Sequence, residues 1–129
     1  MNRQLAPSSI APPAANYALA VRSENVSAWL HTSGIVAIRP DGSIPSDVGE
    51  QADVVWANLH AILAEAGMIA GDVVSITTYV VADQLAALPQ VMAARDRALQ
   101  GHRVASTLVT VPALARPEWK IEISLIASS

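Results

Sequence analysis

Apolar residues recur along this chain with two different periods, and the first of them predicts helix. From Val48 to Ala66 an apolar side chain returns every three or four residues, which is typical of one face of a five-turn amphipathic helix. Asp47 or Ser46 is placed to cap its start, since Asp47 and Glu50 have the spacing of a capping box. Gly67 is expected to end it.

A second helical stretch and five strands follow from the same pattern. Residues 85–99 show the helical period again, through Leu85, Leu88, Met92, Arg95 and Leu99. Stretches rich in β-branched residues, or with strict alternation of apolar and polar positions, predict strands. These strands are Tyr17 to Arg22, Ser27 to Val36, Val73 to Val81, Val104 to Val111 and Trp119 to Ile126. The strand over 73–81 is apolar enough to be buried on both faces.

The order of these elements predicts the architecture. Three prolines make residues 6–15 an extended lead-in, and Pro40-Asp41-Gly42-Ser43 reads as a turn. Helices interleave with strands, and no repeat or linker divides the chain. We therefore expect a single domain over residues 1–129, an α/β or α+β sheet with its helices packed on one face.

Composition narrows the function classes. The chain is 52% hydrophobic and only 15% charged, more apolar surface than one small core hides, so we expect subunits to bury some of it between them. No apolar run reaches the roughly 18 to 20 residues of a membrane span, and the first five residues lack the core of a secretory signal. A cytoplasmic protein is expected. A net charge of −3 offers no general basic surface for nucleic acid.

Several kinds of chemistry have no support in the residues. Zero cysteines exclude a disulfide scaffold, a thiolate metal site and a cysteine nucleophile. No glycine-rich phosphate loop is present, so no nucleotide cofactor is expected. The three histidines, His31, His60 and His102, are far apart without ligand spacing, so we expect no metal site.

A few polar residues remain as candidates for a site. Glu122 lies in mid-strand on the side away from Ile121 and Ile123, either on a solvated face or in a cleft where its carboxylate activates a water. Ser33 and Gly34 end a strand, either as a bulge or as backbone N–H groups presented to a ligand.

Tyr17 also has two interpretations. It is either a core side chain whose hydroxyl is satisfied or the wall of a pocket.

An ordered set of short segments resembles the RidA (YjgF/YER057c/UK114) family of small enamine/imine deaminases over roughly residues 15 to 127. No single motif is specific, and the order and spacing carry the resemblance. The segments are Tyr17, Thr32-Ser33-Gly34, Asp41-Gly42, Asp47 through Gln51, Asn58, Ala66-Gly67, Gly71-Asp72-Val73-Val74, Thr78-Tyr79-Val80, Ala105-Ser106-Thr107 and Ile121-Glu122-Ile123.

The resemblance implies a chorismate-mutase-like α+β fold, with a mixed sheet and two helices on one face. It also implies a homotrimer with a barrel-like core and small-molecule pockets between subunits. Its activity would be cofactor-free hydrolysis of reactive enamines and imines to a carbonyl product and ammonia. Glu122 matches the glutamate that positions the attacking water, Tyr17 the pocket aromatic, and Ser33 and Gly34 the strand end facing the ligand.

One position departs from the deaminase pattern. Aligned without gaps to Val109 and Val111, Ser106 stands where deaminating members have an arginine that clamps the substrate carboxylate. Ser106 and Thr107 would then bind a neutral or differently shaped ligand. Arg103, an odd number of residues away on a strand, points to the opposite face and is a poor substitute.

Three functions therefore stand. The first is a deaminase acting on an enamine or imine other than 2-aminoacrylate. The second is a non-catalytic trimer that binds or senses a small molecule. The third is a ribonuclease or translation inhibitor, against which the acidic pI of about 5.4 argues.

Overall fold

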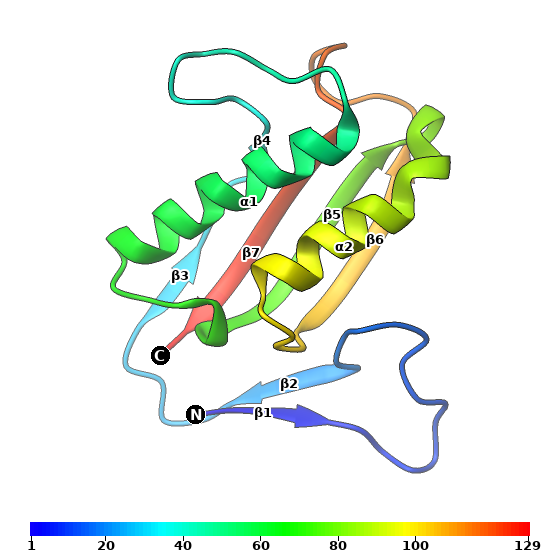
Figure 1. Ribbon diagram of the computed structural model, residues 1–129. Helices are drawn as coiled ribbons and strands as arrows, with labels where there is room; N and C mark the ends of the chain where they lie inside the picture. Colours follow the sequence, from blue (N-terminus) through cyan, green and yellow to red (C-terminus); the bar gives the residue numbers. More distant parts are fainter.

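The computed structural model describes the whole chain, residues 1–129, as a sheet with two α-helices lying across one of its faces (Figure 1). The helices are α1 (Val48–Glu65) and α2 (Leu88–Ala98), and the 3-10 helices are η1 (Ala70–Asp72) and η2 (Ala82–Ala87). The strands are β1 (Asn2–Leu5), β2 (Ala20–Ser23), β3 (Trp29–His31), β4 (Ile35–Val36), β5 (Val73–Val81), β6 (Ala105–Val111) and β7 (Ile121–Ser128). The predicted helices on one face of a mixed sheet are confirmed.

The main sheet has five strands in the order β3-β7-β5-β6, with β4 also paired to β7. Only β5 and β6 run parallel; the other pairs are antiparallel. A parallel pair needs a crossover, and η2 and α2 supply it. The strand that carries Glu122 therefore lies in the middle of the sheet, between β3 and β4 on one side and β5 on the other.

Helix α1 follows its predicted bounds closely. The Asp47 carboxylate accepts a hydrogen bond from the Glu50 amide at 3.0 Å and so caps the helix. At the other end Gly67 has a φ of +70°, a conformation that glycine adopts without strain. The predicted turn before this helix is also present, and hydrogen bonds from the Ser43 hydroxyl and amide hold the pKa of the Asp41 carboxyl below its ordinary value.

Side chains from α1, β5 and β7 meet between the helices and the sheet and form the core. Leu59, Val80 and Ile121 are wholly buried there, in one cluster of 19 buried residues. Neither helix is both long and apolar enough to span a membrane.

Strand β5 corrects one expectation. Ile76, Thr78 and Val80 are buried under the helices, whereas the side chains between them are only half-buried. The helices cover one face of the sheet, so in a single chain only that face is buried. The other, which we call the open face, carries the half-buried side chains of β5.

Other bounds also differ from the prediction. The strand β1 was not expected; it pairs with β2 in a separate antiparallel hairpin beside the end of the main sheet, and Tyr17 lies before β2 rather than within it. The expected strand over 27–36 is two strands, and the first three residues of the expected helix over 85–99 belong to the 3-10 helix η2. Asn2 bonds Ser128 at 2.8 Å, which holds the two ends of the chain together.

Candidate functional site

Glu122 lies on the open face of the sheet. Its neighbours Ile121 and Ile123 point into the core, so alternation sends the Glu122 side chain the other way, where it is half-buried. The register sets it beside Tyr79 of β5 and Val36 of β4. The carboxylate receives no hydrogen bond and no cation from its own chain, which leaves its oxygens available to a ligand or a water.

The segment Thr32-Ser33-Gly34 is a bulge opposite β7. His31 pairs with Ile126 and Ile35 with Ile123, so β7 advances three residues while the β3–β4 side advances four. One residue is extra, as in a β-bulge. Two hydrogen bonds join Thr32 to Leu125. The Leu125 amide donates to the Thr32 hydroxyl and the Thr32 amide donates to the Leu125 carbonyl, each at 3.0 Å.

The bulge brings Gly34 against Glu122. A Cβ atom on Gly34 would lie 2.6 Å from the Glu122 Cδ and 2.9 Å from its Cγ, closer than side-chain atoms pack. The interpretation of this segment as a bulge is therefore confirmed, and its glycine permits the close approach of Glu122. Presentation of its backbone N–H groups to a ligand stays a prediction. The adjacent Ser33 is exposed beside it.

Thr107 and Ser106 lie on opposite faces of β6. Thr107 pairs with Thr77, which pairs with Ser124 of β7, so Thr107 shares the open face with Glu122. Ser106 pairs with Ile76 and therefore lies on the face covered by the helices. The neighbouring open-face position is Ala105, so β6 has no positive charge on either face.

Tyr17 and Ser106 meet at the edge of the sheet. The Ala18 amide bonds the Val104 carbonyl at 2.8 Å, which fixes this part of the lead-in alongside β6. Tyr17 and Ser106 then line a cavity of about 260 Å³ beneath α2, together with Ala15, Met92, Arg95 and Leu108. The predicted residues thus form two groups: Glu122, Gly34 and Thr107 belong to the open face, with Ser33 exposed in the bulge beside Gly34, and Tyr17 and Ser106 belong to the helix side.

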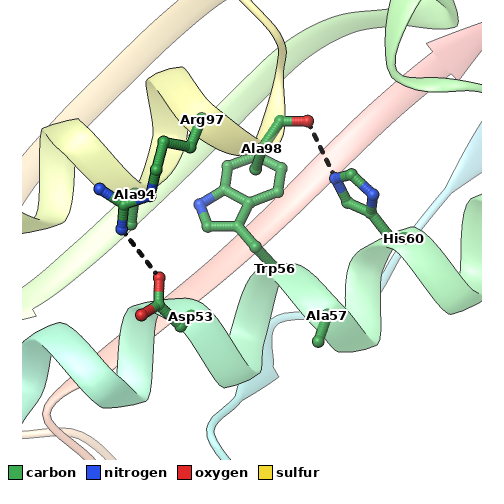
Figure 2. A pocket seen from close by; sticks show the side chains of 7 residues that line it. All are labelled: Asp53, Trp56, Ala57, His60, Ala94, Arg97 and Ala98. Carbon is green, nitrogen blue, oxygen red and sulfur yellow. Dashed lines mark hydrogen bonds and ion pairs between the residues drawn. The ribbon is translucent and has the colours of Figure 1, made fainter.

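A second hollow of about 300 Å³ lies between α1 and α2 and contains none of the predicted site residues (Figure 2). Contacts between the helices frame it: Arg97 pairs with Asp53 at 3.1 Å, and a His60 ring nitrogen bonds the Ala98 carbonyl at 3.0 Å. These contacts account for its polar groups as packing between helices. No three His, Asp or Glu side chains in the chain come together in a way that could hold a metal ion.

Two residues near the site, Gln51 and Arg95, were not identified from the sequence as important to it. Gln51 is wholly buried on α1; its amide donates to the Pro45 and Glu118 carbonyls at 2.8 and 2.9 Å, and its oxygen accepts from the Lys120 amide at 2.9 Å. It fixes the start of β7, two residues before Glu122. A polar residue among the apolar positions of a helix was its only signal.

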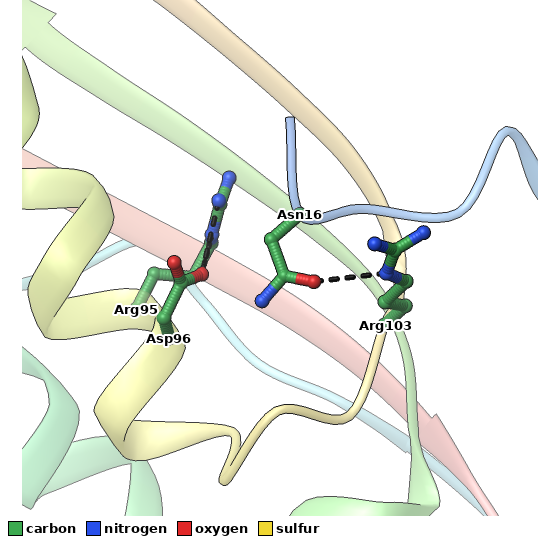
Figure 3. Close-up of polar contacts among 4 residues, drawn as sticks. All are labelled: Asn16, Arg95, Asp96 and Arg103. Atoms are coloured by element: carbon green, nitrogen blue, oxygen red, sulfur yellow. Dashed lines mark hydrogen bonds and ion pairs between the residues drawn. The ribbon is translucent and has the colours of Figure 1, made fainter. Parts of the chain in front are cut away.

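Arg95 carried a similar signal. It stands at an apolar position of the helical period in residues 85–99, whereas a charged residue on such a helix ordinarily lies on the opposite, solvent-facing side. In the structure Arg95 is buried and forms part of the cavity wall. Arg103 does not line this cavity, because its guanidinium is directed to the Asn16 side chain at 2.9 Å (Figure 3).

Comparison with known proteins gives a consistent match. The family model described as endoribonuclease L-PSP matches residues 8–129. A curated relative in Escherichia coli (strain K12), TdcF, is named as a reactive intermediate deaminase and is 32% identical over 78 residues. That match covers 60% of this chain and 55% of the relative, so it spans about half the length of that protein.

Solved structures match over nearly the whole chain. YyfB from Yersinia pestis, described as a protein of unknown function of the conserved Rid family, is 32% identical with a TM-score of 0.89, covering 99% of this chain and 98% of that one. The crystal structure of E. coli TdcF with bound serine is 26% identical with a TM-score of 0.73, covering 96% and 93%.

Proposed function

Because the chain belongs to the endoribonuclease L-PSP family, which is the RidA/YjgF family, we propose that it hydrolyses a reactive enamine or imine. Relatives named as reactive intermediate deaminases support a general deaminase role. The observation that carries the proposal for this chain is the Glu122 carboxylate, unpaired and held against the Gly34 backbone on the open face. The reaction would release ammonia and a carbonyl product in the cytoplasm without a cofactor.

The chemistry suits a single carboxylate. An enamine tautomerises to an imine, and the carbon of the C=N bond is attacked by water. Glu122 accepts a proton from that water as the water oxygen bonds to carbon, and it passes this proton to the nitrogen, which gives a carbinolamine. The carbinolamine hydroxyl then gives up its proton to the nitrogen by way of Glu122, the C–N bond breaks, and the C=O bond forms as ammonia leaves. General-base assistance of this kind contributes about 10²- to 10⁴-fold. Ser33, which adjoins Gly34 in the bulge, and Thr107, which lies two strands away on the open face, would contact the substrate.

The substrate would differ from 2-aminoacrylate. Ser106 stands at the position of the carboxylate-binding arginine in deaminating members, and β6 carries no charge. Losing such a charge-assisted hydrogen bond removes about 1.5–3 kcal/mol of binding. Tyr17, Ser106 and Thr107 are the residues we assign to substrate binding in its place.

A homotrimer with a barrel-like core would complete the site. The open face has no helix over it, and it carries apolar side chains such as Val109, which is 41% exposed, and the half-buried Val36, Tyr79 and Ile126. An uncovered apolar face of this kind favours burial between copies of the chain. Pockets between subunits would then join the open-face residues of one copy to the Tyr17 and Ser106 group of another.

Turnover by the Glu122→Gln variant tests the proposal. The wild type is assayed with enzymatically generated 2-aminoacrylate, 2-iminopropionate and an enamine without an α-carboxylate, with ammonia release as the readout. We expect turnover of at least one of them, and a loss of about 10²- to 10⁴-fold in the variant at unchanged melting temperature and oligomeric state. Equal activity in the variant would contradict the role of Glu122. Wild-type binding of a compound without any product would favour the non-catalytic trimer.

The family description also names an endoribonuclease. Around Glu122 the paired strands of the open face present Val36, Tyr79 and Val109, and a net charge of −3 leaves the chain without the general basic surface that holds a phosphate backbone. We expect RNA to remain intact in the presence of the purified protein at low and at physiological salt. Cleavage that is lost in Glu122→Gln would support the ribonuclease function instead.

A further inference from the structure

Arg95 is a buried cation whose hydrogen-bonding capacity is mostly unused. Its side chain is only 8% exposed, on the side of α2 that faces β6. The one group that it contacts is the neighbouring Asp96: Nε and Nη2 both reach the same Oδ1 atom, at 3.1 and 3.0 Å (Figure 3). A guanidinium has five N–H donors, so at least three have no partner in the chain.

These free donors are not sealed into the protein. The enclosed side-chain nitrogens without a partner are those of Trp56 and Trp119, so the unpartnered Nη1 of Arg95 keeps some access to solvent. Because Arg95 lines the cavity, we expect this nitrogen to be reached from the cavity. Asp96 neutralises the charge only in part, because the two contacts share one oxygen and the Asp96 side chain is 39% exposed to water.

The other two polar groups of the cavity are hydroxyls whose protons have no hydrogen-bond acceptor within the chain. The Tyr17 hydroxyl accepts from the Ala14 amide at 3.3 Å, which leaves its own proton unused. The Ser106 hydroxyl lines the cavity and makes no hydrogen bond within the chain. The rest of the wall is apolar, with Ala15, Met92 and Leu108, and no Asp or Glu lines it. A cavity of about 260 Å³ with a cation, two hydroxyls and no acid selects a small anion.

We propose that this cavity binds the carboxylate of a small organic acid, with Arg95 as the cation that recognises it. The planar fork of a guanidinium matches a carboxylate with two parallel hydrogen bonds, and apolar walls strengthen such a pair by excluding water. The inference deepens the proposed function and rests on its placement of Tyr17 and Ser106 in the substrate site. On this inference the substrate is an acid other than 2-aminoacrylate, not a neutral compound, and its carboxylate is held from α2 instead of from β6.

Arg95 could instead serve only packing, and two substitutions separate the roles. Asp96→Asn removes the competing anion while keeping the size of the side chain, so carboxylate binding becomes several-fold tighter if Arg95 is the receptor. A purely structural Arg95 gives no such gain. Arg97→Met is the matched control, because Arg97 lies on the same helix with its side chain 65% exposed and directed to Asp53.

The test is calorimetric titration of the full-length protein with pyruvate and with pyruvamide, which differ in the charged group. We expect pyruvate to bind at least tenfold more tightly than pyruvamide. Arg95→Met should weaken pyruvate binding by on the order of 10- to 100-fold, and Arg95→Lys by less. Arg97→Met should leave it unchanged. If Arg95→Met does not fold, as its melting temperature will show, Arg95→Lys and Asp96→Asn give the answer.

The possible results distinguish failure of the proposed anion site from failure of the proposed deaminase activity. Equal binding of pyruvate and pyruvamide, no detectable pyruvate binding, or no response to Asp96→Asn would overturn the proposal. Glu122→Gln separates it from the proposed activity, because that variant should lose turnover and still bind pyruvate. Pyruvate binding without turnover of any imine would leave the anion site standing and contradict the deaminase.

Discussion

Replacing Gly34 by alanine perturbs the candidate site through a single methyl group. The added Cβ would lie 2.6 Å from the Glu122 Cδ and 2.9 Å from its Cγ, whereas ordinary contacts begin at 3.4 Å. Gly34 does not have the left-handed backbone that would strain an alanine, so the backbone can keep its conformation. The Glu122 side chain is half-buried and flexible at its end, and it is therefore the group that moves, by about 1 Å.

The effect on activity follows from that displacement. A misplacement of about 1 Å in a catalytic group costs about 10²-fold in rate, which corresponds to about 2.7 kcal/mol in the barrier. Stability should change by less than about 1 kcal/mol, because no core contact is removed and the substitution restricts the unfolded chain. Catalysis and stability should thus separate in Gly34→Ala.

The assay measures kcat/KM for ammonia release from the best enamine or imine substrate, alongside the melting temperature. Gly71→Ala is the matched control, since a Cβ there meets nothing closer than the Ile69 Cδ1 at 3.6 Å and should leave both quantities unchanged. The carbon-13 resonance of the Glu122 carboxyl supplies a readout independent of turnover and should shift in Gly34→Ala alone. Wild-type kcat/KM with an unshifted resonance would refute the close approach.

Three further substitutions test the fold and the assembly. Gln51→Leu leaves two carbonyls and one amide without partners, and we expect the free energy of unfolding in urea to fall by about 2–4 kcal/mol. Asp47→Ala removes the cap of α1 and should cost about 1 kcal/mol in the same experiment, an effect that Asp47→Ser should largely restore. Val109→Glu charges the open face and should dissociate the proposed trimer in light scattering, whereas Leu85→Glu, at an exposed site on η2, should not; a trimer that survives Val109→Glu would contradict burial of this face between subunits.

The elements that local sequence specifies were the ones that could be predicted. The period of three and four residues, the Asp47 cap and Gly67 together located α1 to within a residue or two. The strand β5 was located to the residue by its β-branched run. Such signals act within a few residues of chain, so they need no knowledge of the tertiary contacts.

The elements that depend on distant partners were missed or misplaced. The strand β1 is short and polar, and it exists because β2, which lies 15 residues later, pairs with it. The split of residues 27–36 into β3 and β4 depends on how many residues of β7 stand opposite them. Pairing of this kind leaves no local pattern to read.

For the candidate site, the sequence determined which residues alternate and the tertiary structure decided which face each one occupies. Alternation in β7 was enough to separate Glu122 from the core residues beside it, and alternation in β6 was enough to set Ser106 and Thr107 apart. Only the sheet register and the helices on one face show that Thr107 joins Glu122 and that Ser106 joins Tyr17.

The same limit applies to Arg95. Its place in the helical period was visible in the sequence, but its access to a cavity depends on where α2 lies over β6. The high apolar content of the chain indicated surface to be buried without saying where. The fold leaves the open face uncovered, because both helices lie on the other side of the sheet, and this is the surface that we propose is buried between subunits.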